Sequence, residues 1–133
     1  RQIYVIAPLI EESDKSELKN VNELKVKMDK AFGKLYNIDI MHGKLSNKAK
    51  EEVMEKFKNN DIQILISTTV IEVGVDVANA TVMVVFDSYR FGLSALHQLR
   101  GRVGRSDLQS YFIHYLLLFQ ERRSRIYKYL TVK

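Results

Sequence analysis

The chain has 133 residues, of which 46% are hydrophobic and 28% charged, so it can bury the core of one domain and is not a disordered tail. The absence of cysteine excludes a disulfide scaffold, a thiolate metal site and a cysteine nucleophile. No apolar run is long enough to cross a bilayer and no signal peptide opens the chain, so we expect a cytoplasmic protein without membrane contact. Because the sequence starts at Arg1 and runs directly into a strand-like segment, we expect a fragment of a longer chain.

The positive charge is concentrated in the last third of the chain. The formal net charge is +5, but residues 1–89 carry 12 basic and 14 acidic side chains, whereas residues 90–133 carry nine basic and two acidic ones. Seven of the eight arginines lie in this last third, while eleven of the thirteen lysines lie at or before Lys58. Lysines spread over helices typically form a solvated face, whereas the planar guanidinium of arginine matches phosphate oxygens. The clustered arginines therefore indicate an anionic ligand.

The first half of the chain predicts two strands that alternate with two helices. Residues 3–7 (IYVIA) form a short, β-branched apolar run, which is typical of a buried strand. We expect a polar loop to about residue 19 and then a helix that begins with a capping box at Asn20. One face of this helix carries apolar side chains, namely Val21, Leu24, Met28, Ala31, Phe32 and Leu35. Residues 38–41 predict a second strand, and Ser46 predicts the N-cap of a second helix.

The second half predicts three more strands and two more helices. Residues 62–66 and 81–86 are apolar runs typical of buried strands. A helix is expected over residues 94–100, a strand over residues 111–117 and a last helix from Glu121. Strands that alternate with helices indicate right-handed βαβ units. We therefore predict that the whole chain is one three-layer α/β domain, with a mostly parallel central sheet and helices on both faces. In such sheets, ligands bind beyond the carboxyl ends of the strands.

Several familiar catalytic signatures are missing from the sequence. The chain has no G-x-x-x-x-G-K-[ST] phosphate-binding loop, no G-x-G-x-x-G fingerprint and no H-E-x-x-H motif. Its three histidines, His42, His97 and His114, are far apart in sequence and have no carboxylate company, so we expect no metal site. The sequence therefore contains no self-sufficient site for nucleotide hydrolysis.

The strongest chemical signal is residues 97–105 (HQLRGRVGR), which place three arginines within six positions. Two glycines among them allow close backbone approach to a ligand and a sharp turn. Arg102 and Arg105 are three positions apart, so on a helical turn both guanidinium groups project to the same side. This arrangement suits a polyphosphate ligand and the arginine-finger role in phosphoryl transfer. The alternative is a basic turn paired with acidic neighbours, but only Asp107 lies nearby.

Two other segments directly follow predicted strands. Residues 67–77 (STTVIEVGVDV) offer hydroxyl and backbone N–H groups to an anion, and Asp76 can accept hydrogen bonds from a ribose. Alternatively, Thr68 or Thr69 only caps the next helix. Residues 42–44 (HGK) follow the second strand, and taken alone they indicate a turn with an exposed lysine.

Together and in this order, these segments resemble the second motor lobe of superfamily 2 helicases, and among those the RecG-type DNA helicases. Residues 90–105 (RFGLSALHQLRGRVGR) resemble motif VI of that family with its lead-in, and residues 68–76 resemble its motif V. Residues 8–13 (PLIEES) resemble its motif IV region, and residues 42–44 its phosphate-contacting loop. The resemblance covers nearly the whole chain and implies a RecA-like domain.

The resemblance also implies roles for single residues. Arg102 and Arg105 would reach the γ-phosphate of an ATP that is held, with Mg²⁺, mainly by a first motor lobe. Gln98 would sit beside that phosphate, and Gly74 and Asp76 would border the nucleotide. The residues expected to contact DNA are Thr68, Thr69, His42, Gly43 and Lys44.

At the level of function, the resemblance implies an ATP-dependent helicase that processes branched or duplex DNA in recombination and repair, by replication fork regression and Holliday junction processing. Its expected location is the bacterial cytoplasm, associated with the nucleoid. The first motor lobe is the expected partner, and the chain alone is expected to hydrolyse no ATP.

Three alternatives remain open at this point. A duplex translocase of the transcription-repair coupling type has a similar motif VI, although His97 favours the RecG type. A nucleic-acid-binding module of the same fold would need neither Gln98 nor the spacing of Arg102 and Arg105. A flavodoxin-like signalling or carbohydrate-transfer domain would share the architecture and leave the arginines unexplained.

Overall fold

The computed structural model describes residues 1–7, 14–68, 77, 79–86, 92–103, 107–120 and 123–132; for residues 14–20, 93, 114–120 and 123–132 it describes the backbone alone. Within these ranges the elements follow one another in the order β1 (Gln2–Ile6), α1 (Asp14–Phe32), β2 (Ile38–Met41), α2 (Asn47–Lys58), β3 (Ile64–Ser67), β4 (Ala80–Phe86), α3 (Leu93–Arg100), β5 (Tyr111–Gln120) and β6 (Arg123–Val132).

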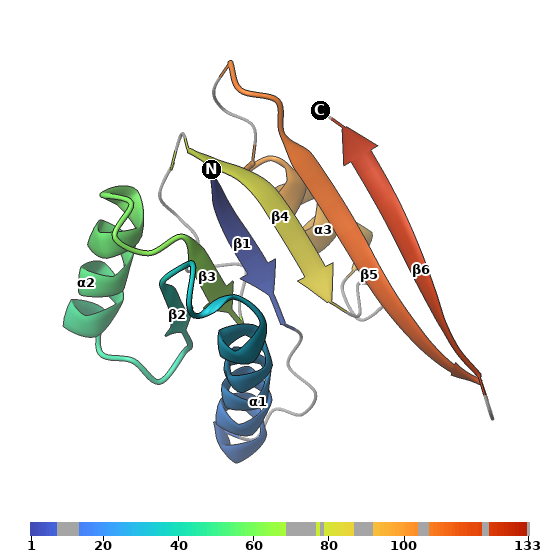
Figure 1. Ribbon diagram of the computed structural model, residues 1–133, viewed down its shortest axis with the longest axis horizontal. Helices are drawn as coiled ribbons and strands as arrows, with labels where there is room; N and C mark the ends of the chain where they lie inside the picture. Colours follow the sequence, from blue (N-terminus) through green and yellow to red (C-terminus); the bar gives the residue numbers. More distant parts are fainter. Residues whose placement is uncertain are drawn as a thin grey trace.

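The strands form one sheet in the order β2-β3-β1-β4-β5-β6 (Figure 1). The first five strands in this order are parallel to their neighbours, and β6 pairs with β5 in the antiparallel direction. Parallel neighbours place all their carboxyl ends at one edge of the sheet, called the carboxyl edge below, and their starts at the opposite, amino edge. The predicted mostly parallel α/β fold is therefore confirmed.

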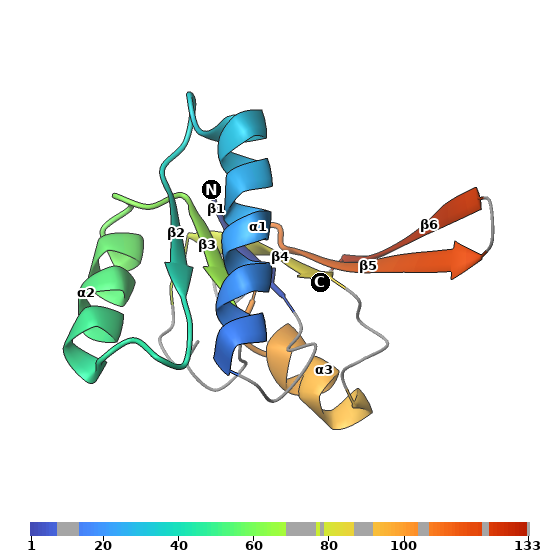
Figure 2. The same ribbon diagram turned by 90° about the horizontal axis from the view of Figure 1, so that it is seen from below.

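Helices cover both faces of the sheet, because alternate residues of each strand point to opposite faces. Tyr4 and Ile6 of β1 belong to a buried cluster that includes Phe57 of α2 and Leu99 of α3. Val5, one position along, belongs to a second cluster with side chains of α1. Figure 2 shows α1 and α3 on different sides of the sheet. The three-layer arrangement thus follows from apolar strands that are buried on both faces.

Helix α2 is fixed at both of its ends. At its start the Ser46 Oγ accepts a hydrogen bond from the Ala49 N–H (3.1 Å), as predicted. Near its end Phe57 is fully buried and packs edge-on against Tyr4, with ring centroids 4.8 Å apart. The buried amide of Gln2 donates to the carbonyl groups of Phe57 and Ile62 (2.7 Å to Ile62). These bonds tie the end of α2 to the start of β1, so the first turn of α2 is held firmly at the carboxyl edge.

The prediction for the first helix was wrong at both ends. The helix starts at Asp14, well before the predicted capping box at Asn20, because the polar segment that was taken for a loop consists largely of good helix formers. It ends at Phe32, so Leu35 lies in the following turn and is 76% exposed. Val21, Leu24 and Met28 do face the sheet as expected.

The predicted last helix from Glu121 was also wrong, because residues 123–132 form the strand β6. This segment is rich in β-branched and aromatic residues, which favour an extended chain, and all ten of its residues pair with β5. Only Tyr111–Tyr115 of β5 pair with β4. The rest of the β5–β6 hairpin therefore extends past β4 (Figure 1).

Candidate functional site

The parallel register brings the ends of β1, β2 and β3 together at the carboxyl edge. Ser67, the last residue of β3, lies opposite Ile6 of β1 and Met41 of β2. Backbone hydrogen bonds continue this alignment past the strand ends. The Ala7 N–H donates to the Ser67 carbonyl (2.9 Å), and the Thr68 N–H donates to the Met41 carbonyl (3.3 Å). The two segments that follow β2 and β3 therefore begin side by side.

Residues 42–45 form a tight turn between β2 and α2. The Leu45 N–H donates to the His42 carbonyl, and the Lys44 N–H donates to Nδ1 of the His42 ring, both at 3.2 Å. Gly43 and Lys44 are exposed, whereas His42 is half-buried. The turn thus presents Gly43 and Lys44 to solvent at the carboxyl edge.

Thr68 lies next to this turn but differs from it in exposure. Its side chain and backbone together are only 2% exposed, and the preceding Ser67 is fully buried. Both residues are polar, and residue type alone does not indicate burial at the end of a central strand. Gly43 and Lys44 are therefore the more accessible of the predicted DNA-contacting residues in the described part of the chain.

The predicted arginine motif begins on α3 and continues into a helical turn. The Gly101 N–H donates to the His97 carbonyl and the Arg102 N–H to the Leu99 carbonyl, both at 3.0 Å. Leu99 and Val103, four positions apart, are fully buried in the core. Gln98 is exposed and Arg102 half-buried, and they too are four positions apart, so they share a side of this turn. Because Leu99 and Val103 are buried, the side of the turn that carries Gln98 and Arg102 has a fixed orientation relative to the sheet.

Gly101 has a backbone conformation that any residue adopts. Its φ and ψ are −66° and −15°, and a Cβ placed there would lie 3.4 Å from the nearest atom, the Gln98 carbonyl oxygen. The sharp turn that the glycines were expected to allow therefore does not occur at Gly101, and Gly104 lies outside the described residues. Close approach of a ligand to the Gly101 backbone stays a prediction.

The first turn of α2 carries a basic signal that the sequence analysis missed. Helix N-termini carry partial positive charge and favour acidic residues, but this turn contains none. It instead carries Lys48 and Lys50, of which Lys48 is exposed. The sequence signal that identifies this feature is two lysines close behind the Ser46 cap. Together with Lys44, they place three lysines at this end of α2, ahead of Glu51 and Glu52 in the next turn.

Four predicted site residues lie outside the described residues, namely Thr69, Gly74, Asp76 and Arg105. Within the described ranges, no group of three or more His, Asp or Glu side chains could hold a metal ion. Among the described helices, none has the length and apolar character required to span a membrane.

The comparison with known protein families agrees with this geometry. Residues 1–107 match the profile of the helicase conserved C-terminal domain. The chain belongs to this helicase family. It is 54% identical, over 113 residues, to the ATP-dependent DNA helicase RecG of Bacillus subtilis (strain 168), which confirms the predicted resemblance to RecG-type helicases. The aligned part is 85% of this chain and 17% of that protein, so the chain spans less than a fifth of its curated relative.

Solved structures of helicase lobes share the fold. A structure of RecG bound to a three-way DNA junction matches this helicase domain with a TM-score of 0.62 and 44% sequence identity, over 78% of this chain and 13% of that chain. The C-terminal domain of the DEAD-box protein Dbp5 matches with a TM-score of 0.57 at 19% identity, over 85% and 59% of the two chains. The predicted RecA-like fold is therefore confirmed.

The first prediction concerns the two glycines of this helicase domain that follow helices. Gly101→Ala should leave the free energy of unfolding unchanged or raise it by about 0.4–1 kcal/mol, because alanine fits the backbone and restricts the unfolded chain. Gly33→Ala should lower it by about 1–3 kcal/mol, because its Cβ would lie 2.5 Å from the Asp29 carbonyl oxygen. Urea denaturation measures both values. A larger loss for Gly101→Ala than for Gly33→Ala would contradict the described geometry.

Proposed function

We propose that the chain is the second motor lobe of an ATP-dependent DNA helicase that acts on branched DNA in recombination and repair, through fork regression and Holliday junction processing. The observation that carries the proposal is the turn after α3, where buried Leu99 and Val103 hold Arg102 on the same side as Gln98. The 54% identity to a protein named as an ATP-dependent DNA helicase supports the same class of activity.

The proposed catalytic role is to stabilise charge during phosphoryl transfer. A first motor lobe would bind most of the ATP and Mg²⁺, because this sequence has no Gly-rich phosphate-binding loop. Closure of the two lobes then carries Arg102 and Arg105 to the γ-phosphate, with Gln98 beside it and Gly74 and Asp76 bordering the nucleotide. An arginine finger supplied from outside the nucleotide cradle raises the rate by about 10³–10⁵ in phosphoryl-transfer systems.

The fold does not require a glycine at position 101, and this supports the proposed approach of the nucleotide to the turn after α3. Nothing in the fold of the lobe requires a glycine there, since its backbone is helical and a Cβ would make only ordinary contacts. A side chain at position 101, beside Gln98 on the turn, would instead stand in the way of a group that approaches from outside. The nucleotide and the first lobe are the groups that the proposed closure brings there.

The proposed DNA grip is the turn of residues 42–45 together with the first turn of α2. Gly43, Lys44 and Lys48 are exposed there, and the positive end of α2 adds to the charge of the lysines. Phosphate groups of a DNA strand would neutralise this charge. Thr68 borders the same surface and holds the end of β3 against β2, and Thr69 is proposed to contact the DNA with it.

Translocation follows from coupling these two surfaces. Both the turn of residues 42–45 and α3 follow strands whose carboxyl ends lie at the carboxyl edge. ATP-driven closure against the first lobe, and release after hydrolysis, would therefore move the DNA grip as one rigid body with the arginines. We place this activity in the bacterial cytoplasm, at the nucleoid, where branched DNA arises.

Substitution of Arg102 tests the catalytic role in the complete two-lobe motor. Arg102→Ala should lower DNA-stimulated ATP hydrolysis by about 10³-fold or more, with little change in nucleotide binding, because the finger acts mainly in the transition state. Arg100→Ala is the matched control, since Arg100 is an exposed arginine at the end of α3, two positions before Arg102, and this variant should hydrolyse ATP at nearly the normal rate. Equal losses of binding and rate in Arg102→Ala, or ATP turnover by this chain alone, would contradict the proposal.

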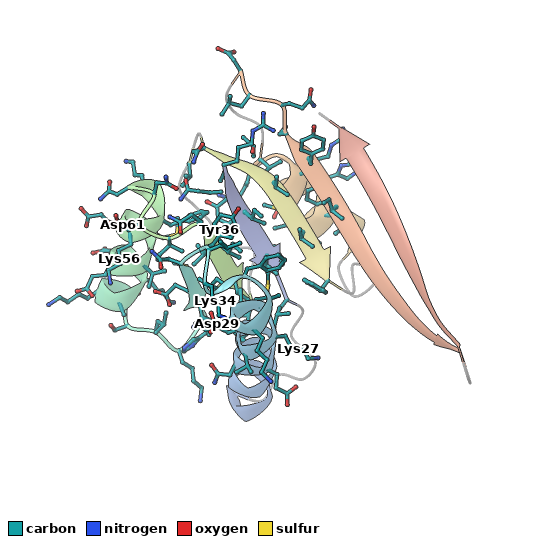
Figure 3. The ribbon with its side chains drawn as sticks, viewed as in Figure 1. Lys27, Asp29, Lys34, Tyr36, Lys56 and Asp61 are labelled. Atoms are coloured by element: carbon teal, nitrogen blue, oxygen red, sulfur yellow. The ribbon has the colours of Figure 1, made fainter. Side chains whose placement is uncertain are left out.

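A charge reversal at either end of α2 tests the DNA grip. Lys48→Glu should change the free energy of unfolding by less than about 1 kcal/mol, because the gain of an acidic residue at the helix start is offset by repulsion from Glu51 and Glu52, three and four positions on. It should also weaken DNA binding and reduce by about 1 the magnitude of the slope of log Kobs against log salt concentration. Lys56→Glu makes the same charge change in the last turn of α2 (Figure 3). It should lower stability and leave the salt slope unchanged.

Urea denaturation and fluorescence anisotropy with labelled branched DNA measure the two quantities. Equal effects of Lys48→Glu and Lys56→Glu on DNA affinity would show that only net charge matters. The DNA grip would then not lie at the start of α2.

A further inference from the structure

His42 differs from the other residues of the turn in the contacts it makes. Its ring is half-buried, and Nδ1 accepts a hydrogen bond from the backbone N–H of Lys44 at 3.2 Å. Its carbonyl accepts a second bond from the Leu45 N–H. His42 thus accepts hydrogen bonds from two of the three residues that follow it, and these bonds stabilise the turn.

The hydrogen bond identifies Nδ1 as the acceptor atom of the ring. A nitrogen that accepts a bond from an N–H carries no proton, so the neutral imidazole of His42 has its proton on Nε2. The same bond occupies the Lys44 N–H, which is therefore not available to a DNA phosphate. Lys44 can then contribute to binding through its ammonium group, whose position depends on how the turn is held.

The turn is also attached to the sheet immediately before His42. The Met41 carbonyl accepts a bond from the Thr68 N–H, and Met41 is fully buried. On the other side, Ser46 caps α2 and fixes where the helix begins. The backbone is therefore fixed on both sides of residues 43–45, and the side chain of His42 supplies a bond from within the turn.

We propose that His42 is a positioning residue, which holds the Lys44 backbone so that Gly43 and Lys44 face a phosphate of the DNA strand, and that its ring does not itself bind the DNA. The proposal rests on the proposed function, since it assumes that this turn contacts DNA. It refines the expectation from the sequence, in which His42 was one of the DNA-contacting residues.

Two amide substitutions test the roles of the two ring nitrogen atoms separately. In His42→Asn the Oδ1 atom takes the place of Nδ1 and can accept from an N–H two residues ahead, as asparagine commonly does in turns. In His42→Gln the amide nitrogen takes the place of Nε2, and the acceptor near the backbone is lost. DNA affinity of the 133-residue chain for a branched DNA, measured by fluorescence anisotropy at fixed salt, should remain within about twofold for His42→Asn. It should fall by about threefold to tenfold for His42→Gln and His42→Ala, the effect of one lost neutral hydrogen bond.

A second measurement does not depend on DNA. Hydrogen exchange of the Lys44 amide, followed by NMR, should be slow in the unchanged chain and in His42→Asn, and fast in His42→Gln and His42→Ala. Retained DNA affinity in His42→Gln with a loss in His42→Asn would overturn the proposal, because the ring would then contact DNA through Nε2. Equal DNA affinities in all variants, or equal exchange of the Lys44 amide, would also overturn it.

Lys44→Gln separates this proposal from the proposed function. This variant keeps the backbone bond to His42 but removes the ammonium charge. If Lys44→Gln binds DNA as tightly as the unchanged chain, the DNA grip is elsewhere and the proposed function fails at this site. If the Lys44 amide still exchanges slowly in His42→Asn and fast in His42→Gln, His42 holds the backbone of the turn even though the turn does not bind DNA.

Discussion

The parallel alignment of β2, β3 and β1 is the constraint on which the site depends. Because these strands run in one direction, every segment that leaves them starts at the carboxyl edge, and the hydrogen bond from Thr68 to the Met41 carbonyl keeps two of these segments in contact. An antiparallel neighbour would place the His42 turn and Thr68 at opposite edges of the sheet. The buried amide of Gln2 has a supporting role, since it fixes the far end of α2 and so the helix start that carries Lys48.

Both parts of the site combine buried apolar side chains, which fix the element, with more exposed polar side chains on another side. On α3 and the turn after it, Leu99 and Val103 are buried in the core, and Gln98 and Arg102 occupy another side of the same turn. On α2, Phe57 is buried while Lys48 stays exposed. Gln98, Arg102 and Lys48 thus lie on helices or a helical turn whose orientation is fixed by burial of another side. This suits a lobe that moves as one body, because motion of the core is passed directly to the groups that we propose to bind phosphate.

The sequence predicts the parts of this structure that depend on strongly apolar, periodic segments. Strands such as Ile38–Met41 and Ala80–Phe86, and the Ser46 cap, follow from local residue types. The start of α1 and the strand β6 do not, because one depends on helix formers without an apolar stripe and the other on pairing with β5. The site residues are recognisable from their motifs, but the burial of Thr68 and the internal bond of His42 depend on tertiary contacts between segments far apart in sequence.

The central claim is that DNA binds at the carboxyl edge, beside the start of α2. The most direct measurement is an NMR titration of the isotopically labelled chain with a short branched DNA, in which the backbone amide signals are followed one by one. The account predicts that the largest shifts occur at Gly43, Lys44 and Lys48, while Tyr36 and Asp61, which lie near the amino edge (Figure 3), keep their positions. Large shifts at Tyr36 and Asp61 with unchanged signals in the His42 turn would contradict it.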